Sequence, residues 1–329
     1  QYRLDFIERD AAAHDFDGYE LDFTRFIWNF ALGEERAHAG EMTDLIGKAR
    51  ARLNAIGERR GRPYTFAVHV MDSPELSLEL GQDVETWLAE GLIDVLVVGM
   101  GYLPYSLRLD RWLALGRQYG VPVYPSVNTN TYTDWWKDAF QRPTAWHDAI
   151  RAHSAYYWQE GADGMYLFNF FCQQDSNVGS MSGDGLYGSL SQIGDPATLV
   201  GKDKIYAIQP TCDSGFCQHG SGPAALPVAL DAVERKLPLQ IGPDGDDPNA
   251  RARIRARTTG GDSDTRVWFR LNHKLLAEPT RDGDWLEAPV PQGTLRPGCN
   301  ELSVWCSAPV MTAESPVIVH WVFVPISYA

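Results

Sequence analysis

Hydrophobic and polar positions follow one pattern over the first 203 residues of the chain. Apolar residues at helical spacing alternate with short apolar runs that are typical of buried strands. Strands that alternate with helices in this way indicate βαβ units and a parallel sheet. We expect helices at 2–14, 41–60, 76–90, 107–119 and 144–160, and strands at 17–23, 64–70, 93–98, 122–128 and 164–170.

The pattern changes from about residue 204 onward. Short strands with alternating apolar positions are expected at 251–257, 265–271, 300–306 and 317–324, separated by Gly, Pro and Asp. This pattern is typical of an antiparallel β-sandwich. The sequence therefore predicts two domains, a parallel α/β domain at 1–203 and a β-sandwich at 204–329.

Five βα units do not close an eight-stranded barrel. Either the chain supplies strands 4–8 of a (β/α)8 TIM barrel whose N-terminal part is missing, or the sheet is open and doubly wound. The partial barrel is favoured, because an open sheet edge that starts in mid-helix makes a poor independent fold. The chain begins with Gln1 and not with Met, so we expect a fragment or a processed product.

The stretch at 17–23 organises the predicted chemistry. Read as a strand, it places Glu20 and Asp22 on the same face. Burying two carboxylates on a strand costs free energy unless they are paired or hydrogen-bonded, so their presence there needs a reason. Residues near the C-terminal end of a barrel strand project into the active site, so Asp22 is the first catalytic candidate. The alternative is that both acids pair with barrel arginines such as Arg25.

Asp22 needs a partner if the protein is a glycosidase. Such enzymes use two carboxyl groups, about 5 to 5.5 Å apart for retention or about 6.5 to 9.5 Å for inversion. Glu20 lies about 6 to 7 Å back along the strand, at a depth that suits a protonated acid or a supporting partner. Asp72, just past the next predicted strand, is the other candidate, although the segment 72–75 also makes an ordinary helix N-cap.

The ends of the later strands carry amides, and aromatic residues follow several of the predicted strands. Loops after strands hold the binding residues of a barrel, so these aromatic side chains could stack on sugar or could pack against the second domain. His69 could assist proton transfer, but a lone strand histidine is more often a core residue. The predicted substrate contacts are Arg25, Trp28, His69, Asn128, Asn130, Tyr132, Trp135 and Asn169. The other aromatic residues of these loops are Tyr102, Tyr105 and Trp136.

Composition narrows the set of partners. With 29 basic and 43 acidic residues the net charge is -14, which disfavours nucleic acid and anionic membrane surfaces. No apolar run is long enough for membrane insertion. The 11 Trp and 14 Tyr residues fit sugar binding, although aromatic residues fill cores as often. Nothing in the sequence indicates an oligomeric state.

The five cysteines leave two readings open. Cys212 and Cys217, or Cys299 and Cys306 on neighbouring turns or strands, could form disulfides in an oxidising compartment, or all five could be unrelated thiols. We expect an extracytoplasmic location, periplasmic or secreted. Neither pair has partners at zinc-finger spacing, so no structural metal is predicted, and no cofactor is required.

Several stretches resemble a known group of proteins. DGYELDFTRF, HVMDSPE, LGQDVETWLAEGLIDVLVVG and GADGMYLFNF are similar to the bacterial glycoside-hydrolase-like barrel proteins of the glycosyl hydrolase-like 10 group. ALPVALDAVERKLPLQIGPD, WFRLNHKLL and GTLRPGCNELSVW resemble the β-sandwich that follows the barrel in that group. The resemblance implies that the strands are 4–8 and that the acids of the first one line the cleft. It does not assign a substrate.

The resemblance also shows which catalytic residues of similar barrels this chain lacks. Barrel glycosidases of the largest clan place a catalytic Glu at strand seven, where this chain has Asn128. The pattern Asp-Gly-x-x-Leu-Asp is similar to family 18 chitinases, but Thr24 stands where their catalytic Glu does, and Thr cannot donate a proton at a useful pKa. The second acid could therefore lie upstream, or the mechanism could differ, or the barrel could be inactive.

Other motifs give no support to competing functions. The segment 183–188 matches the dinucleotide pattern by letter, but a Ser-rich loop separates it from the preceding strand. No Gly-x-Ser-x-Gly elbow and no His pair at catalytic zinc spacing are present, so esterase and metalloprotease functions lack support.

The sequence thus predicts a glycoside hydrolase-like protein that acts on O-glycosidic bonds of a poly- or oligosaccharide. Asp22 would be the nucleophile or general base, and Glu20, Asp72 or an upstream acid the proton donor. The competing prediction is a carbohydrate-binding or surface scaffold protein that kept the cleft but is not catalytic.

Overall fold

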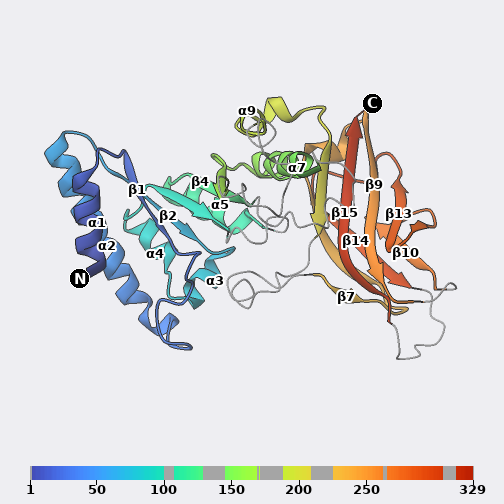
Figure 1. Ribbon diagram of the computed structural model, residues 1–329, viewed down its shortest axis with the longest axis horizontal. Coiled ribbons are helices and arrows are strands. Elements are labelled where there is room, and N and C mark those ends of the chain that lie inside the picture. The colour runs from blue at the N-terminus through green and yellow to red at the C-terminus, as the bar shows by residue number, and fades with distance from the viewer. Residues whose placement is uncertain are drawn as a thin grey trace.

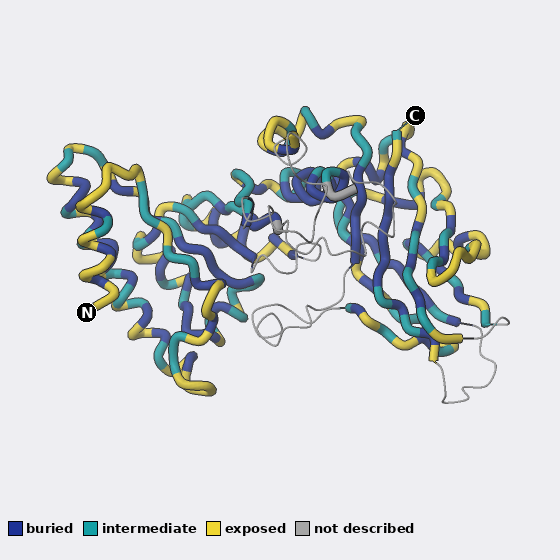
Figure 2. The backbone as a smooth tube through the Cα atoms, in the orientation of Figure 1, coloured by how far each residue is buried: buried dark blue, intermediate teal, exposed yellow. Residues whose placement is uncertain are grey.

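The computed structural model describes residues 2–99, 107–128, 145–168, 170, 188–208, 225–261, 265–306 and 316–328. The described residues form two regions, one helical with a parallel sheet and one of antiparallel strands (Figure 1). Buried residues run through the middle of both regions (Figure 2).

In the first region, the elements follow one another as helix and strand. They are α1 (Tyr2–Ala13), β1 (Gly18–Asp22), η1 (Arg36–His38), α2 (Ala39–Arg60), β2 (Thr65–Val70), α3 (Pro74–Glu79), α4 (Val84–Ala89), β3 (Val95–Val98), α5 (Asp110–Tyr119), β4 (Val123–Asn128), α7 (Ala145–Glu160) and β5 (Tyr166–Phe168). Within the described residues these strands form one sheet in the order β1-β2-β3-β4-β5, and each pairs in parallel with the next. The predicted βαβ organisation is confirmed.

The parallel sheet is strongly curled. The Tyr166 hydroxyl on β5 donates a hydrogen bond of 2.9 Å to Glu20 Oε1 on β1, at the other end of the strand order. In a flat sheet, four strand spacings of about 4.8 Å would hold these strands about 19 Å apart. In a closed eight-stranded barrel, strands four positions apart face each other across the interior. The curl therefore fits part of a barrel, with the two residues on its concave face.

The two faces of the parallel sheet differ in polarity. The face away from the concave side carries apolar side chains such as Leu21, Phe66, Val68, Leu96 and Val123. These side chains belong to the core that also includes Ile46 and Leu53 of α2 and Trp112 of α5. The apolar face packs against the helices, as in a barrel, and leaves the concave face to polar residues.

The second region contains antiparallel sheets. Its elements, with the short helices that lead to them, are α9 (Leu190–Ile193), η3 (Pro196–Leu199), β6 (Lys204–Ile208), β7 (Val228–Ala229), β8 (Arg235–Ile241), η4 (Pro243–Asp246), β9 (Ala250–Thr259), β10 (Val267–Leu271), β11 (Lys274–Leu275), β12 (Thr280–Asp282), β13 (Trp285–Val290), β14 (Gly298–Cys306) and β15 (Ile318–Tyr328). In the described part of the chain, the smaller sheet has the order β11-β10-β14-β8 and the larger sheet β12-β13-β9-β15-β6, with β7 beside β15. The described strands fit the predicted β domain.

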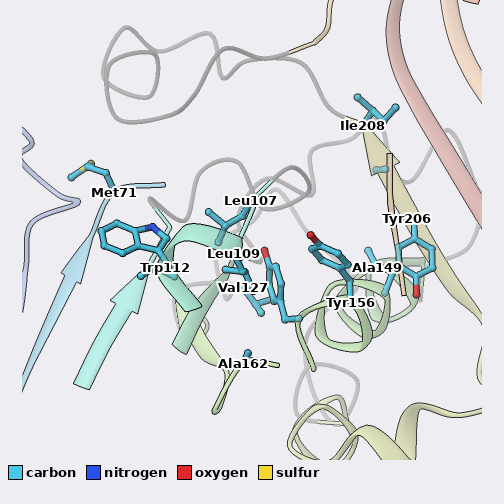
Figure 3. Close-up of a cluster of buried hydrophobic side chains, with 14 of the residues drawn as sticks. Met71, Leu107, Leu109, Trp112, Val127, Ala149, Tyr156, Ala162, Tyr206 and Ile208 are labelled. Carbon is cyan, nitrogen blue, oxygen red and sulfur yellow. The ribbon is translucent and has the colours of Figure 1, made fainter. Parts of the chain in front are cut away.

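Helix α7 connects the two regions. It contacts β4 of the parallel sheet and also β6, β8 and η4 of the antiparallel region. Figure 3 shows Ala149 of α7 beside Tyr206 of β6, within one continuous buried cluster that also includes Trp112. A Cβ at Gly242 would collide with the Tyr206 hydroxyl and lie 3.2 Å from the Tyr156 nitrogen, so the backbones approach closely there.

Two helices occupy the range in which we expected one helix at 76–90. Gly81 adopts a φ of +81° and ends the first helix, where a side chain would meet the Glu35 carbonyl and the Phe30 ring. Ser73 caps α3 and Asp83 caps α4, since each side chain accepts a hydrogen bond from a backbone N–H of the following turn. The prediction missed this break because the apolar period continues across it.

Strands β8 and β13 were not among the predicted strands, and each contains a proline. Pro238 lies on β8, which is at the edge of the smaller sheet in the described part of the chain. Pro289 on β13 pairs with Arg253 of β9 and lies beyond the end of the short strand β12. Edge positions tolerate proline because no neighbouring strand needs its missing N–H.

Of the two readings left open for Cys299 and Cys306, the disulfide is excluded and the free thiols are confirmed. Both residues lie on the same strand, β14, and both are free thiols. Seven residues of extended strand separate them by about 23 Å, far beyond the Cα separation of about 4.4 to 6.8 Å that a disulfide spans. Cys212 and Cys217 lie outside the described residues.

Candidate functional site

Strand register places a set of polar side chains on the concave face. Asp22 pairs with His69, and Ser126 pairs with Tyr166. Because side chains alternate along a strand, Glu20 shares the face of Asp22. The hydrogen bond from Tyr166 to Glu20 shows that the two ends of the sheet meet on this side. These five side chains, which we call the concave cluster, come from four different strands.

Asp22 is the most heavily bonded member of the concave cluster. Its Oδ1 accepts hydrogen bonds from the Thr24 backbone N–H at 2.8 Å and from the Thr24 hydroxyl at 2.6 Å. Its Oδ2 accepts from Arg25 Nε at 3.2 Å. This local turn fixes the carboxylate at the C-terminal end of β1. The Asp22 side chain is 25% exposed, so it is held in place but still open to solvent.

Arg25 extends from this turn across the concave face. Its guanidinium carbon lies 4.4 Å from the ring centroid of Phe168 on β5. A guanidinium over an aromatic face is attracted by the ring's negative face. Arg25 therefore pairs with Asp22, as the alternative prediction held for this acid, whereas Glu20 bonds to Tyr166 and, among the described residues, to no arginine.

His69 lies beside Asp22 on the neighbouring strand β2 and is fully buried, with 0% exposure. Its Nε2 is 2.7 Å from the Gly99 carbonyl oxygen, so Nε2–H donates to that oxygen and Nδ1 carries the lone pair. Nδ1 is 3.6 Å from Asp22 Oδ1. Burial lowers the pKa of His69, and the nearby Asp22 charge opposes this shift. Its ring packs 4.9 Å from that of Tyr166. His69 is a buried ring that supports the site.

Glu20 differs from Asp22 in its surroundings. Burial raises the pKa of its carboxyl, the hydrogen bond from Tyr166 opposes this, and the charge of Asp22 raises the pKa further. Glu20 is nevertheless an exposed residue whereas Asp22 is half-buried, so the expectation that Glu20 lies deeper than Asp22 is wrong. Burial and the neighbouring Glu20 also raise the pKa of Tyr166, so that hydroxyl remains a donor. A carboxyl with a raised pKa suits proton donation.

The other predicted site residues lie outside the concave cluster or outside the described residues. Asp72 follows β2, and its carbonyl oxygen accepts a hydrogen bond of 3.1 Å from Trp112 Nε1 of α5. Trp28 lies in the loop after β1 and is 38% exposed. Asn128 is the last residue of β4, but its side chain lies outside the described part. Also outside the described residues are Asn130, Tyr132, Trp135 and Asn169, with Tyr102, Tyr105, Trp136 and segment 183–187.

Sequence reasoning missed Tyr166, Phe168 and Ser126. Ser126 is 2% exposed on the concave face, and among the described residues its hydroxyl has no hydrogen-bond partner. The parity of the strand predicted at 164–170 does put Tyr166 and Phe168 on one face. Which face points inward depends on register with β4, and the chain's own pattern does not contain that information.

The described residues contain no group of three or more His, Cys, Asp or Glu side chains arranged to hold a metal ion. The prediction that no cofactor is required stays a prediction. Among the helices of the described part, none is long and apolar enough to cross a membrane.

The chain matches no protein-family model, and a search of curated proteins finds no match either. Solved structures show weak likeness. An acetyl xylan esterase from the rumen bacterium Butyrivibrio proteoclasticus has 10% identity and a TM-score of 0.22, over 40% of this chain and 31% of that one. A β-porphyranase of glycoside hydrolase family 86 from Bacteroides plebeius has 8% identity and a TM-score of 0.25, over 89% and 75% of the two chains.

A family GH18 chitinase from Chromobacterium violaceum has 12% identity and a TM-score of 0.27, over 94% of this chain and 69% of that one. Glycoside hydrolases and carbohydrate esterases are thus among the weak structural neighbours. Likeness at this level assigns neither a family nor an activity.

Proposed function

We propose that the chain carries part of a carbohydrate-active (β/α)8 barrel of the glycoside-hydrolase-like kind, with β1 to β5 as strands four to eight. Two features support this proposal. The sheet is curled enough for side chains of β1 and β5 to meet, and its concave face is polar while the opposite face packs on helices.

The proposed reaction is hydrolysis of an O-glycosidic bond. One observation carries it: Glu20 and Asp22 lie two positions apart on one strand but in different environments, the first beside Tyr166 and the second beside Arg25. Their Cα atoms are about 7 Å apart. Glu20, whose pKa is raised, would protonate the leaving oxygen, and Asp22 would act as nucleophile or general base.

Arg25 and Phe168 would form the floor on which a sugar ring rests, with the guanidinium available to sugar hydroxyls. Trp28, exposed in the loop after β1, would add a stacking surface. The roles of Asp72, Asn128, Asn130, Tyr132, Trp135 and Asn169 as further acid or substrate contacts stay predictions. So do the extracytoplasmic location and the absence of a cofactor.

One observation favours a second candidate function, a carbohydrate-binding protein without catalysis. Both oxygens of Asp22 already accept hydrogen bonds, two of them from Thr24. A nucleophile needs an oxygen that faces the substrate with a lone pair available. A carboxylate held in this way also suits a binding site, where it would keep Arg25 in position.

Reducing-end release from a panel of polysaccharides tests the proposal. We expect release by the parent protein to fall by about a hundredfold or more in Asp22→Asn and Glu20→Gln. Aryl glycosides with good leaving groups need no proton, so Glu20→Gln should lose less activity on them. Asp44→Asn on the surface of α2 removes a carboxylate far from the strand and should leave activity unchanged.

Two outcomes would contradict this reaction. Full activity in both Asp22→Asn and Glu20→Gln would show that neither carboxylate takes part in the reaction. No release by the parent, combined with retardation in affinity gels that contain a glycan, would replace hydrolysis with the binding function.

A further inference from the structure

Strand β9 carries a row of arginines on one face of the larger antiparallel sheet. Arg251, Arg253 and Arg255 alternate with the more buried Ala252 and Ile254. Side chains two positions apart on a strand project from the same face, about 7 Å from each other. The row therefore presents guanidinium groups at a regular spacing along one face, and it lies in the antiparallel region, away from the concave cluster.

A cavity of about 670 Å³ lies over this row. The three arginines line it, and apolar residues such as Pro289 and Pro325 form part of its wall. This volume lies within the usual range for small-ligand sites. The cavity is thus large enough for a short oligosaccharide, with charged groups along one side and apolar surface along the other.

The arginines of the row contact both charged and neutral groups. Glu287 stands between two arginines, 3.6 Å from Arg253 Nε and 3.6 Å from Arg255 Nε. One carboxylate thus serves two guanidinium groups at distances longer than a good hydrogen bond. Arg251 donates to the carbonyl oxygens of Pro248 at 3.1 Å and Ala250 at 3.2 Å, which are neutral acceptors.

The remaining charged residues of the cavity wall have partners elsewhere. Glu278 pairs with Arg266, and Asp203 Oδ1 accepts a hydrogen bond of 3.0 Å from the Tyr328 N–H. Lys204 Nζ donates to Asp244 at 2.6 Å. The cavity wall therefore carries four basic residues, Lys204 and the three arginines, and three acidic ones, Asp203, Glu278 and Glu287, on a chain whose net charge is -14. Burial lowers the pKa of Arg255, the charges of Glu287 and Asp282 oppose this, and Arg253 lowers the pKa further.

An aromatic side chain continues the row at one end. The Arg255 guanidinium carbon lies 4.8 Å from the ring centroid of Trp285, which pairs with Arg257 across β13 and β9. The Trp285 ring also packs 5.7 Å from Phe323. Indole faces stack on the apolar faces of sugar rings, while guanidinium forks bind carboxylate or sulfate oxygens in pairs.

We propose that this cavity is a binding site for an acidic oligosaccharide, held through its carboxylate or sulfate groups by Arg251, Arg253 and Arg255. Guanidinium groups at regular spacing match the repeated anionic groups of such a chain. Nucleic acid also carries repeated anions, but the strongly acidic chain repels a long phosphodiester polymer. The site is separate from the concave cluster and does not depend on catalysis there.

Isothermal titration of the full chain tests the proposal with four probes: trigalacturonate, a sulfated galactan tetrasaccharide, neutral galactotriose and a short single-stranded DNA. We expect one of the two acidic saccharides to bind at least about tenfold more tightly than galactotriose, and the binding to weaken as salt is added. The tighter of the two identifies the anionic group. Equal binding of galactotriose, no binding of either acidic saccharide, or equal binding of the DNA would overturn the proposal.

Variants connect the binding to the cavity. Arg253→Ala should weaken acidic saccharide binding about tenfold or more, while Glu287→Gln should strengthen it because a competing carboxylate is removed. Arg281→Ala is the matched control, since Arg281 pairs with the buried Leu286 and so lies on the opposite face of the same sheet. Thermal melting checks that each variant is folded. Unchanged binding by Arg253→Ala, or equal loss in Arg281→Ala, would exclude the arginine row.

Discussion

At the scale of single residues, the two carboxylates of β1 differ in the groups that surround them. Glu20 and Asp22 have the same chemistry and lie on the same face of β1. Asp22 is surrounded by donors from its own turn, whereas Glu20 meets one tyrosine hydroxyl and is the more exposed of the two residues. A pair with two environments is what acid and base roles require.

Glu20 should make stability depend on pH. Because its pKa is raised in the folded protein, the folded state holds the proton to higher pH than the unfolded state does. Its contribution is therefore favourable at low pH and is lost as pH rises above about 4.3, the value for an unperturbed glutamate. Glu20→Gln keeps an acceptor for Tyr166 without the charge. We expect it to raise the melting temperature by roughly 1 to 2 °C at pH 7 and by less at pH 3.5.

Scanning calorimetry at the two pH values measures this difference. The exposed Glu58→Gln on α2 controls for the loss of a carboxylate as such. A Glu20→Gln variant that melts lower than the parent at pH 7, or equally displaced at both pH values, would show that burial of the Glu20 charge has no net cost.

At the scale of elements, the space around a helical glycine shows how closely that helix packs against its neighbours. Gly116 of α5 faces β4, and a Cβ there would collide with Val123 Cγ2 and lie 2.7 Å from the Val121 carbonyl oxygen. Gly47 of α2 has no such neighbour within 4 Å. The same residue type is therefore a packing requirement in one helix and an open position in the other.

Paired Gly→Ala substitutions test this contrast. Gly116→Ala should lower the free energy of unfolding by about 1 to 3 kcal/mol, because the added methyl overpacks the contact of helix and strand. Gly47→Ala should raise it by about 0.5 to 1 kcal/mol, through better helix propensity alone. Urea unfolding followed by circular dichroism gives both values. Equal effects in the two variants would show that α5 can move away from β4 at little cost.

At the scale of the whole molecule, a buried polar cluster stands where α7 meets the antiparallel region. Asp244 of η4 accepts hydrogen bonds from Lys204 at 2.6 Å, Tyr206 at 2.5 Å and Tyr328 at 2.6 Å. The side chains of Lys204 and Asp244 are 1% and 3% exposed. Burial and the adjacent Asp244 charge raise the pKa of Tyr206 well above its ordinary value, which keeps this hydroxyl a donor.

Removal of the Asp244 charge should destabilise this junction strongly. Asp244→Asn leaves the Lys204 ammonium buried without its counter-ion, at an expected cost of about 3 to 5 kcal/mol. The ion pair of the exposed Asp284 with Arg257 is the control, since Asp284→Asn should cost less than about 1 kcal/mol. Urea unfolding measures both. A small loss in Asp244→Asn would mean that Lys204 reaches solvent or gives up its proton.

Much of the fold could be predicted because helices and strands leave a periodic pattern of apolar residues in the local sequence. The βαβ order, the antiparallel strands and the shared face of Glu20 and Asp22 all follow from spacing within a few residues. Local chemistry also indicated the Asp22 and Arg25 pair, which lies within a single turn. Strands β8 and β13, each of which contains a proline, were not predicted.

The sequence by itself determined which residues alternate and which elements form, since both depend on neighbours a few positions apart. The tertiary structure decided which of these residues meet. The curl of the parallel sheet brings Tyr166 to Glu20 and Phe168 to Arg25 across more than 140 residues. The length of β14 separates Cys299 from Cys306. Contacts of this kind depend on strand register and sheet curvature, which arise from the packing of the whole core and have no local signature.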